Sequence, residues 1–208
     1  SSAKDENVMI VSGRNVYDAF GRVAKAFYPT TEGTGSKSTF NKSFDNVSPT
    51  ITVYDVLDRA TSVTLPDNST TTTEYTVDNG SHALVTTVTD ALHNVQATHT
   101  NGSGKTMKTI QKSGPDGEIA TSFEYDGIQR LVRVTDTEGN VTTSTYDMGE
   151  VTKTRRTMIV PNQAIATYVT QWTYDSHNRL LEMIYPDEEK ITYSYNLGGQ
   201  LEKVHGYK

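Results

Sequence analysis

The chain has 208 residues, a formal net charge of −6 and no cysteine. The acidic balance argues against a nucleic-acid groove, where clustered lysine and arginine must neutralise phosphate, and the lack of cysteine excludes disulfides and thiolate metal sites. No apolar run approaches the roughly 20 residues that a membrane-spanning helix needs. With a mean hydropathy of −0.56 and many threonines, the composition favours a thin sheet with a modest apolar face over one thick core.

The first patterned segment, residues 15–27, is compatible with two structures. Its apolar residues stand at helical spacing, but Gly21 in the middle of a helix would cost roughly 1 kcal/mol relative to alanine. The segment also shares its register with three later segments, one of which contains the β-branched run Thr61–Leu65. We therefore predict strands here. The apolar residues at helical spacing are Val16, Phe20, Val23 and Phe27.

A Tyr-Asp pair occurs five times in the chain, and in four of these cases an arginine stands five places after the tyrosine. Three units reach the aromatic residue at the next unit boundary after 21 positions, at Tyr75, Tyr146 and Tyr195. A fixed period of this kind indicates a repeat protein. The pairs are Tyr17-Asp18, Tyr54-Asp55, Tyr125-Asp126, Tyr146-Asp147 and Tyr174-Asp175, and the arginines are Arg22, Arg59, Arg130 and Arg179.

Each unit is predicted to be a β-hairpin with a turn at each end. In the unit from Tyr174, residues 175–178 (Asp-Ser-His-Asn) suit a turn, because Asp, Ser and Asn side chains can hydrogen-bond nearby backbone groups. Residues 180–185 then follow as a strand with one wetter face. Pro186 begins the second turn, since proline pre-sets φ for the first central position.

A fifth, degenerate unit is predicted from Thr89, where both the tyrosine and the arginine are missing. This assignment places Asn101-Gly102 at the second turn of the unit. No proline-rich or charge-rich linker separates the units, so we expect one continuous repeat array at residues 15–208. Residues 1–14 are expected to form a leading strand or linker, and residues 1–208 together to be a fragment of a longer protein.

The repeated pattern resembles the YD repeat of the Rhs family. That family includes bacterial Rhs and wall-associated polymorphic toxins, shell components of insecticidal toxin complexes, and animal teneurins. The similarity rests on Tyr-Asp, two residues, often glycine, then arginine, a strand, Pro-Asp-Gly and a closing Tyr-x-Tyr, over roughly residues 17–204. The family's glycine is replaced by Asp58, Gln129 and Asn178, and we expect looser turns there.

The resemblance implies an all-β fold of tandem antiparallel hairpins that form a continuous twisted sheet, a slice of a larger spiral shell. In the toxins of the family, the shell encloses a C-terminal polypeptide. Related toxins also have a self-cleaving core motif with an Asp-Pro pair, and this sequence contains no Asp-Pro. That activity is therefore not transferred to this chain.

No catalytic, metal or cofactor site is predicted. His93 and His99 could face one way on a strand, but no third ligand stands at a spacing typical of a metal site. The sequence contains no nucleophile-elbow, zincin or P-loop motif. We therefore expect a protein without enzymatic activity.

The repeat-motif residues allow two interpretations. In the structural one, which we favour because these residues recur with the period of the fold, aspartate caps the turn, arginine pairs with an acid and tyrosines stack between strands. In the other, they form a ladder of sugar-binding sites, and Trp172 and Tyr193 are further candidates for stacking on a glycan. The structural set is Tyr17, Asp18, Arg22, Tyr54, Asp55, Arg59, Tyr125, Asp126, Arg130, Tyr146, Asp147, Tyr174, Asp175, Arg179 and Tyr195.

The favoured function is a non-enzymatic structural segment of a secreted or cell-surface protein, which contributes wall to a shell that encloses or delivers a toxin. Its partners would be other repeats of the same polypeptide and the enclosed C-terminal toxin polypeptide. The alternative is a cell-surface adhesion module that binds glycans or a partner protein. Neither interpretation involves nucleic acid, membrane insertion by this segment or a cofactor.

Overall fold

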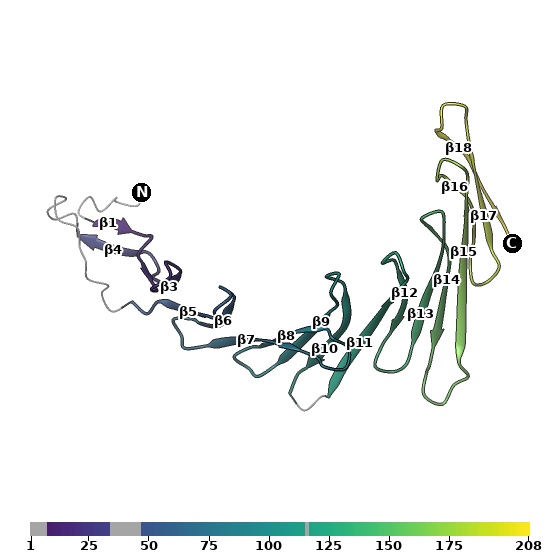
Figure 1. Cartoon of the computed structure of the whole chain (residues 1–208). Helices are drawn as coiled ribbons and strands as arrows, with labels where there is room; N and C mark the ends of the chain where they lie inside the picture. The colour runs from purple at the N-terminus through teal and green to yellow at the C-terminus, as the bar shows by residue number, and fades with distance from the viewer. Residues whose placement is uncertain (1–7, 34–46, 115–116) are drawn as a thin grey trace. The chain divides into compact units, whose positions relative to one another are not determined.

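The computed structural model describes residues 8–33, 47–114 and 117–208. Within these ranges, all regular elements are β-strands (Figure 1). Residues 15–27 form the two strands β2 (Asn15–Tyr17) and β3 (Val23–Ala26). The all-β prediction is therefore confirmed, and the helical spacing in this segment does not produce a helix.

The strands are arranged in two antiparallel sheets. β1 (Val8–Val11) pairs with β4 (Thr30–Gly33) in a two-stranded sheet. In the sixteen-stranded sheet, strands follow one another in sequence order, with β3 next to β5 (Thr50–Tyr54). The chain divides into two compact units: residues 1–76 with 85–96, and residues 77–84 with 97–208.

The strands are rich in threonine, valine and tyrosine, whose branched or flat side chains pack well on a pleated surface. β14 (Glu150–Met158) and β15 (Ala166–Tyr174) have nine residues each and are longer than their neighbours. The remaining strands of the large sheet are β5 (Thr50–Tyr54), β6 (Ala60–Thr64), β7 (Thr70–Val77), β8 (Leu84–Thr89), β9 (Val95–Thr100), β10 (Thr106–Lys112), β11 (Glu118–Tyr125), β12 (Leu131–Thr135), β13 (Val141–Asp147), β14 (Glu150–Met158), β15 (Ala166–Tyr174), β16 (Leu180–Ile184), β17 (Lys190–Tyr195) and β18 (Leu201–Tyr207).

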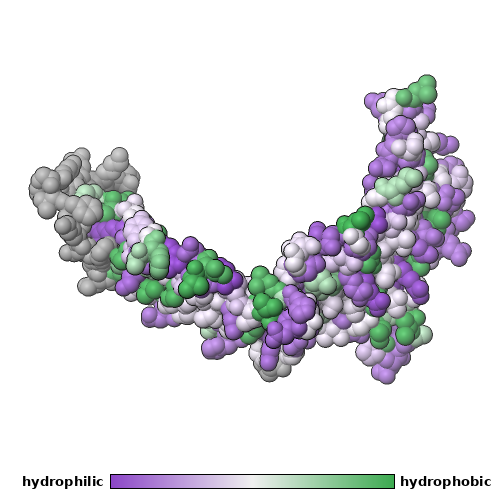
Figure 2. Space-filling model, viewed as in Figure 1, coloured by the Kyte–Doolittle hydropathy of each residue, from purple (hydrophilic) through white to green (hydrophobic). Residues whose placement is uncertain are grey.

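The described part of the chain has almost no buried core. Its only buried residues are Ala83, Val85 and Ala97, and many larger apolar side chains are exposed. Figure 2 shows apolar residues interspersed with hydrophilic ones on the visible face. Because so little apolar surface is removed from water, the sheet must rely on contacts between neighbouring strands.

A β-bulge occurs at every tyrosine of the Tyr-Asp pairs. Tyr125 lies opposite Leu131, while Glu124 lies opposite Arg133, so Val132 is an extra residue on the returning strand. A bulge increases the local twist and redirects the side chain next to it. The same register shift occurs at Tyr17, Tyr54, Tyr146, Tyr174 and Tyr195.

In four of the Tyr-Asp turns, the third residue after the aspartate adopts a positive φ, which is 80° at Gly21, 66° at Gln129 and 58° at Asn178. We expected looser turns where glycine is replaced, and for Gln129 and Asn178 this is wrong. Their N–H groups donate to the aspartate carbonyl oxygen at 3.0 Å, compared with 3.1 Å for Gly21. At Asp58 the same bond is longer, at 3.3 Å. The surrounding hydrogen bonds hold the left-handed conformation whether or not glycine occupies the position.

Gly21 allows this conformational requirement to be measured, because an added Cβ there would meet no atom within 4 Å. We expect Gly21→Val to lower the free energy of unfolding by about 1–2 kcal/mol, since a β-branched residue is disfavoured at positive φ. Gly21→Asn should change the free energy of unfolding by only about 0.3 kcal/mol, because asparagine tolerates this conformation. Thermal unfolding followed by circular dichroism distinguishes the two variants, and equal melting temperatures would contradict the argument.

Candidate functional site

Each complete Tyr-Asp turn is closed by its aspartate carboxylate. In the turn from Asp126 to Arg130, Oδ1 of Asp126 accepts hydrogen bonds from the backbone N–H of Ile128 at 3.0 Å and of Arg130 at 2.9 Å. Oδ2 accepts a bond from Nε of Arg130 at 2.7 Å. The backbone N–H of Asp126 also donates to the carbonyl oxygen of Arg130, at 2.9 Å. One carboxylate therefore satisfies three donors and fixes the direction of the arginine side chain.

The same geometry recurs in four turns. In each of them, Nε of the arginine lies 2.7 Å from Oδ2 of the aspartate four residues earlier, and both side chains are partly buried. The four arginines thus occupy equivalent positions. The pairs are Asp18–Arg22, Asp55–Arg59, Asp126–Arg130 and Asp175–Arg179.

Each of these arginines also lies on a tyrosine of the following hairpin. Cζ of Arg130 is 4.6 Å from the ring centroid of Tyr146, and Cζ of Arg179 is 4.7 Å from that of Tyr195. Arg22 lies on Tyr54 at 4.8 Å and Arg59 on Tyr75 at 4.0 Å. All four distances are within the range of a cation–π interaction.

The hydroxyl group of each tyrosine completes the link between hairpins. It donates to the carbonyl oxygen of the residue after the arginine, at 2.7 Å from Tyr146 to Leu131 and at 2.9 Å from Tyr195 to Leu180. Aspartate therefore holds arginine, arginine supports the next tyrosine, and the tyrosine hydroxyl anchors its strand to the preceding one. We call this set of contacts the Asp-Arg-Tyr relay.

The degenerate unit has a different register from the one we predicted. The side-chain oxygen of Asn101 accepts hydrogen bonds from the N–H groups of Ser103 at 3.0 Å and Lys105 at 2.9 Å, as the aspartates do. Tyr125 donates its hydroxyl to the carbonyl oxygen of Thr106, at 2.9 Å. The turn at Asn101 is thus equivalent to a Tyr-Asp turn, and its assignment as a second turn is wrong. Asparagine supplies the same acceptor as aspartate, which the letter pattern did not reveal.

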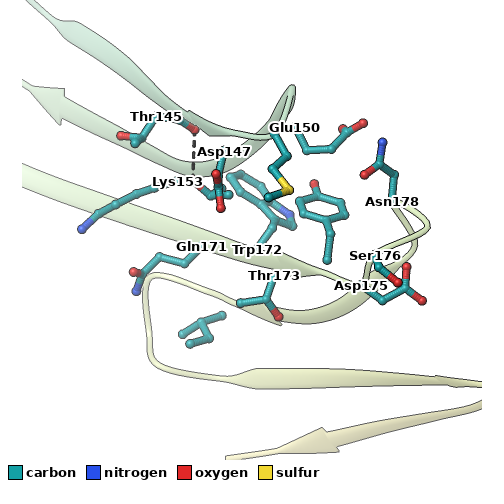
Figure 3. Close-up of a pocket in the computed structure, with 14 residues that line it drawn as sticks. Thr145, Asp147, Glu150, Lys153, Gln171, Trp172, Thr173, Asp175, Ser176 and Asn178 are labelled. Atoms are coloured by element: carbon teal, nitrogen blue, oxygen red, sulfur yellow. Dashed lines mark hydrogen bonds between the residues drawn. The ribbon is translucent and has the colours of Figure 1, made fainter.

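The hairpin at Tyr146-Asp147 has a different turn. Asp147 pairs directly with Glu150 across a two-residue turn in which Met148 and Gly149 have φ of 45° and 98°. Positive φ at both central positions is typical of a primed hairpin turn. The turn is too short to include the arginine of the relay, and a pocket of about 490 Å³ lies beside it (Figure 3).

The pocket contains one of the two residues considered for glycan stacking. Trp172, half-buried on β15, lines it together with Tyr174. Tyr193, on β17, lies opposite Val204 and is not among the lining residues, so the structure does not bring the two candidates together. Glu150 also lines the pocket and was not among the residues predicted from the sequence. The absence of an arginine five places after Tyr146 was a signal that this turn differs from the others.

Neither a metal site nor a membrane-spanning helix is found in the described part of the chain. No group of three or more histidine, aspartate or glutamate side chains there is arranged to hold a metal ion. Across the same residues, no helix is long and apolar enough to cross a membrane.

No protein-family model matches the chain, and no curated protein sequence matches it. Solved structures do match. A crystal structure of TcdB2-TccC3 matches with a TM-score of 0.45 and 12% identity, covering 98% of this chain and 17% of that chain. A Tc holotoxin pore from Photorhabdus luminescens matches with a TM-score of 0.48 and 12% identity, covering 97% and 16%. The chain thus spans about a sixth of the length of these solved chains.

The pKa of the Asp175 carboxyl is lowered to about 2 by the hydrogen bonds of its turn. The backbone N–H of Arg179 has the largest effect, the Arg179 side chain and the N–H of His177 add to it, and partial desolvation opposes them. The pKa of Asp126 is lowered as well, with the backbone N–H of Arg130 as the largest cause. The turns therefore stabilise the ionised carboxylates.

Acid should weaken these turns. Because the folded-state pKa of Asp175, about 2, is below the unfolded value of about 3.9, its stabilisation is complete above about pH 4 and is lost as the pH falls toward 2. Asp175→Asn should unfold at lower urea than the parent at pH 7, and the difference should disappear near pH 2. Glu138→Gln, in an exposed turn, serves as the control. A difference that persists at pH 2 would contradict the role of the carboxylate charge.

The contact between arginine and tyrosine can be measured with a double-mutant cycle of Arg130→Ala and Tyr146→Leu. We expect a coupling energy of about 0.5–1 kcal/mol, as for a partly exposed cation–π contact. Arg133→Ala is the matched control, because its pair with Glu124 is long, at 3.5 Å, and largely exposed. Urea unfolding gives the four free energies. Full additivity of Arg130→Ala and Tyr146→Leu would show that the ring and the guanidinium do not support each other.

Proposed function

We propose that the chain is a non-enzymatic wall segment of a hollow β-shell. In this role each hairpin is a structural unit, and the protein works by extending a continuous sheet around a polypeptide that the shell encloses or delivers. The observation on which this proposal rests is the Asp-Arg-Tyr relay, which recurs with the period of the fold.

The relay supports a structural role because it occupies the groups that a ligand would need. The Asp126 carboxylate is used by three donors of its own turn, and the Arg130 guanidinium is held between that carboxylate and the ring of Tyr146. The hydroxyl of Tyr146 is bound to the preceding strand. A sugar ring could stack on the face of Tyr146 that Arg130 covers only by displacing Arg130.

The near absence of a core supports the same proposal. A globular binding domain buries larger side chains, whereas the buried residues described here are two alanines and a valine. A sheet stabilised by links between neighbouring hairpins can be extended by further hairpins without a change in the design of each one. Such a sheet is suited to forming a wall.

The enclosed polypeptide and the extracellular location rest on the resemblance of the sequence to the YD repeat. In the toxins of that family, the shell encloses a C-terminal polypeptide, and a protein of this kind is secreted or displayed on a cell surface. We extend both features to this chain as part of the proposal, together with the other repeats of the same polypeptide as its partners.

One observation favours a second function, binding of a glycan at the cell surface. Trp172 and Tyr174 line a pocket together with polar side chains, including Gln171 and Asn178, and aromatic faces with adjacent hydrogen-bonding groups are suited to sugars. The relay does not repeat at this pocket, so the observation concerns one hairpin and not the whole array.

The shell can be tested by cryo-electron microscopy and limited proteolysis of the polypeptide expressed from its complete reading frame. We expect these hairpins in a closed wall around internal density, with the enclosed polypeptide protected from protease. A combined Arg130→Ala and Arg179→Ala variant should lose protection, whereas Arg133→Ala should keep it.

Hairpins with solvent on both faces and no enclosed density would contradict the shell. Glycan binding that is lost in Trp172→Ala, in a protein without an enclosed polypeptide, would instead support the adhesion function.

A further inference from the structure

The turns of the relay place a cation opposite each following tyrosine, with one exception. Continuing the β12–β13 register to the turn places Arg130 opposite Tyr146, and the β16–β17 register places Arg179 opposite Tyr195. Continuing the β14–β15 register in the same way places Glu150 opposite Tyr174. In this hairpin a glutamate therefore stands at the register position that an arginine occupies in the others.

The charge reversal coincides with the pocket. Asp147, Met148 and Glu150 line it from the shortened turn, and Trp172 and Tyr174 line it from β15 (Figure 3). Burial raises the pKa of the Tyr174 hydroxyl, and the nearby charge of Glu150 raises it further. None of the ion pairs within the described part of the chain includes Asp147 or Glu150. The pocket thus has an aromatic ring and carboxylates, as the relay does, but not the arginine of the relay.

We propose that this pocket binds the guanidinium of an arginine side chain presented by a second polypeptide segment. The chain itself provides the precedent, because Arg130 and Arg179 lie on the equivalent tyrosines while held by a carboxylate. In the pocket, the incoming arginine lies on the ring of Tyr174 and donates to Glu150 and Asp147. This assignment goes beyond the proposed wall function and does not depend on it.

The charges that line the pocket favour a cation. Asp175 is already paired with Arg179 at 2.7 Å, which leaves Asp147 and Glu150 as the carboxylates available to a ligand. Lys153 also lines the pocket, but its side chain points away from Trp172 (Figure 3). Arginine suits the site better than lysine, because its planar guanidinium both stacks on an aromatic ring and donates two parallel bonds to carboxylates.

Trp172 is the only tryptophan of the chain, so its fluorescence reports on this pocket alone. We would titrate the 208-residue chain with acetyl-Gly-Arg-Gly-amide, with the lysine counterpart, and with the counterpart that has neutral, isosteric citrulline. We expect a saturable change with the arginine peptide, weaker binding of the lysine peptide, and no saturation with the citrulline peptide. Methyl glycosides serve as probes for the alternative ligand.

Variants at Glu150 test the assignment directly. Glu150→Gln should weaken binding of the arginine peptide by about tenfold, as expected when a charge-assisted hydrogen bond is lost. Glu150→Arg should abolish binding, because the new side chain would occupy the site in the manner of Arg130. Glu138→Arg, at an exposed turn, makes the same charge change and should leave binding unaltered. Circular dichroism confirms that each variant is folded.

Several results would overturn the proposal. The first is the lack of a saturable response to the arginine peptide, and the second is equal binding of the arginine and citrulline peptides. The third is equal weakening of binding by Glu138→Arg and Glu150→Arg, which would indicate a general effect of net charge. A saturable response to a methyl glycoside in the absence of one to arginine would assign the pocket to sugars.

Discussion

The structure depends on the aspartate–arginine pair that four of the five Tyr-Asp turns contain. An exposed ion pair alone contributes little, about 0–1 kcal/mol, and these pairs are only partly buried. Their importance is geometric. The carboxylate of Asp126 orders the turn backbone and also fixes the Arg130 side chain, so that the guanidinium is already oriented when the next strand brings Tyr146 onto it. Since little entropy remains to be lost, a modest contact becomes sufficient to align two hairpins.

The weakness of the core explains why such links are needed. With Ala83, Val85 and Ala97 as the only buried residues in the described ranges, hydrophobic burial cannot hold the register of the sheet by itself. Polar contacts across strands contribute as well, for example the 3.0 Å hydrogen bond between the hydroxyls of Thr64 and Thr70. Each contact joins adjacent strands, so stability is close to a sum of nearest-neighbour terms, as in other repeat proteins. Damage at one turn should therefore affect the neighbouring hairpins most.

The sequence was sufficient to predict the hairpins, because the spacing from tyrosine to arginine and the period of 21 residues reflect the geometry of the turns directly. The prediction of strands instead of a helix in residues 15–27 was also correct, and Gly21 adopts a positive φ there. The register of the degenerate unit could not be predicted in the same way. Asn101 offers the same acceptor as aspartate but does not match the Tyr-Asp pattern. The pattern therefore predicted a second turn at Asn101, where the structure has the equivalent of a Tyr-Asp turn. The bulges at the tyrosines likewise depend on pairing between strands, which the order of residues does not show.

The pocket at Tyr174 was missed for a related reason. Tyr146-Asp147 matches the repeat, but the turn that follows is shortened, and this changes which residue faces the next tyrosine. The strands on either side keep their antiparallel register, so the fold tolerates the change while the local charge is inverted. In an array where regular units use their aromatic and charged groups for internal contacts, a unit that loses its own cation has those groups available for a ligand. Departures from the repeat are therefore the positions at which binding sites should be sought.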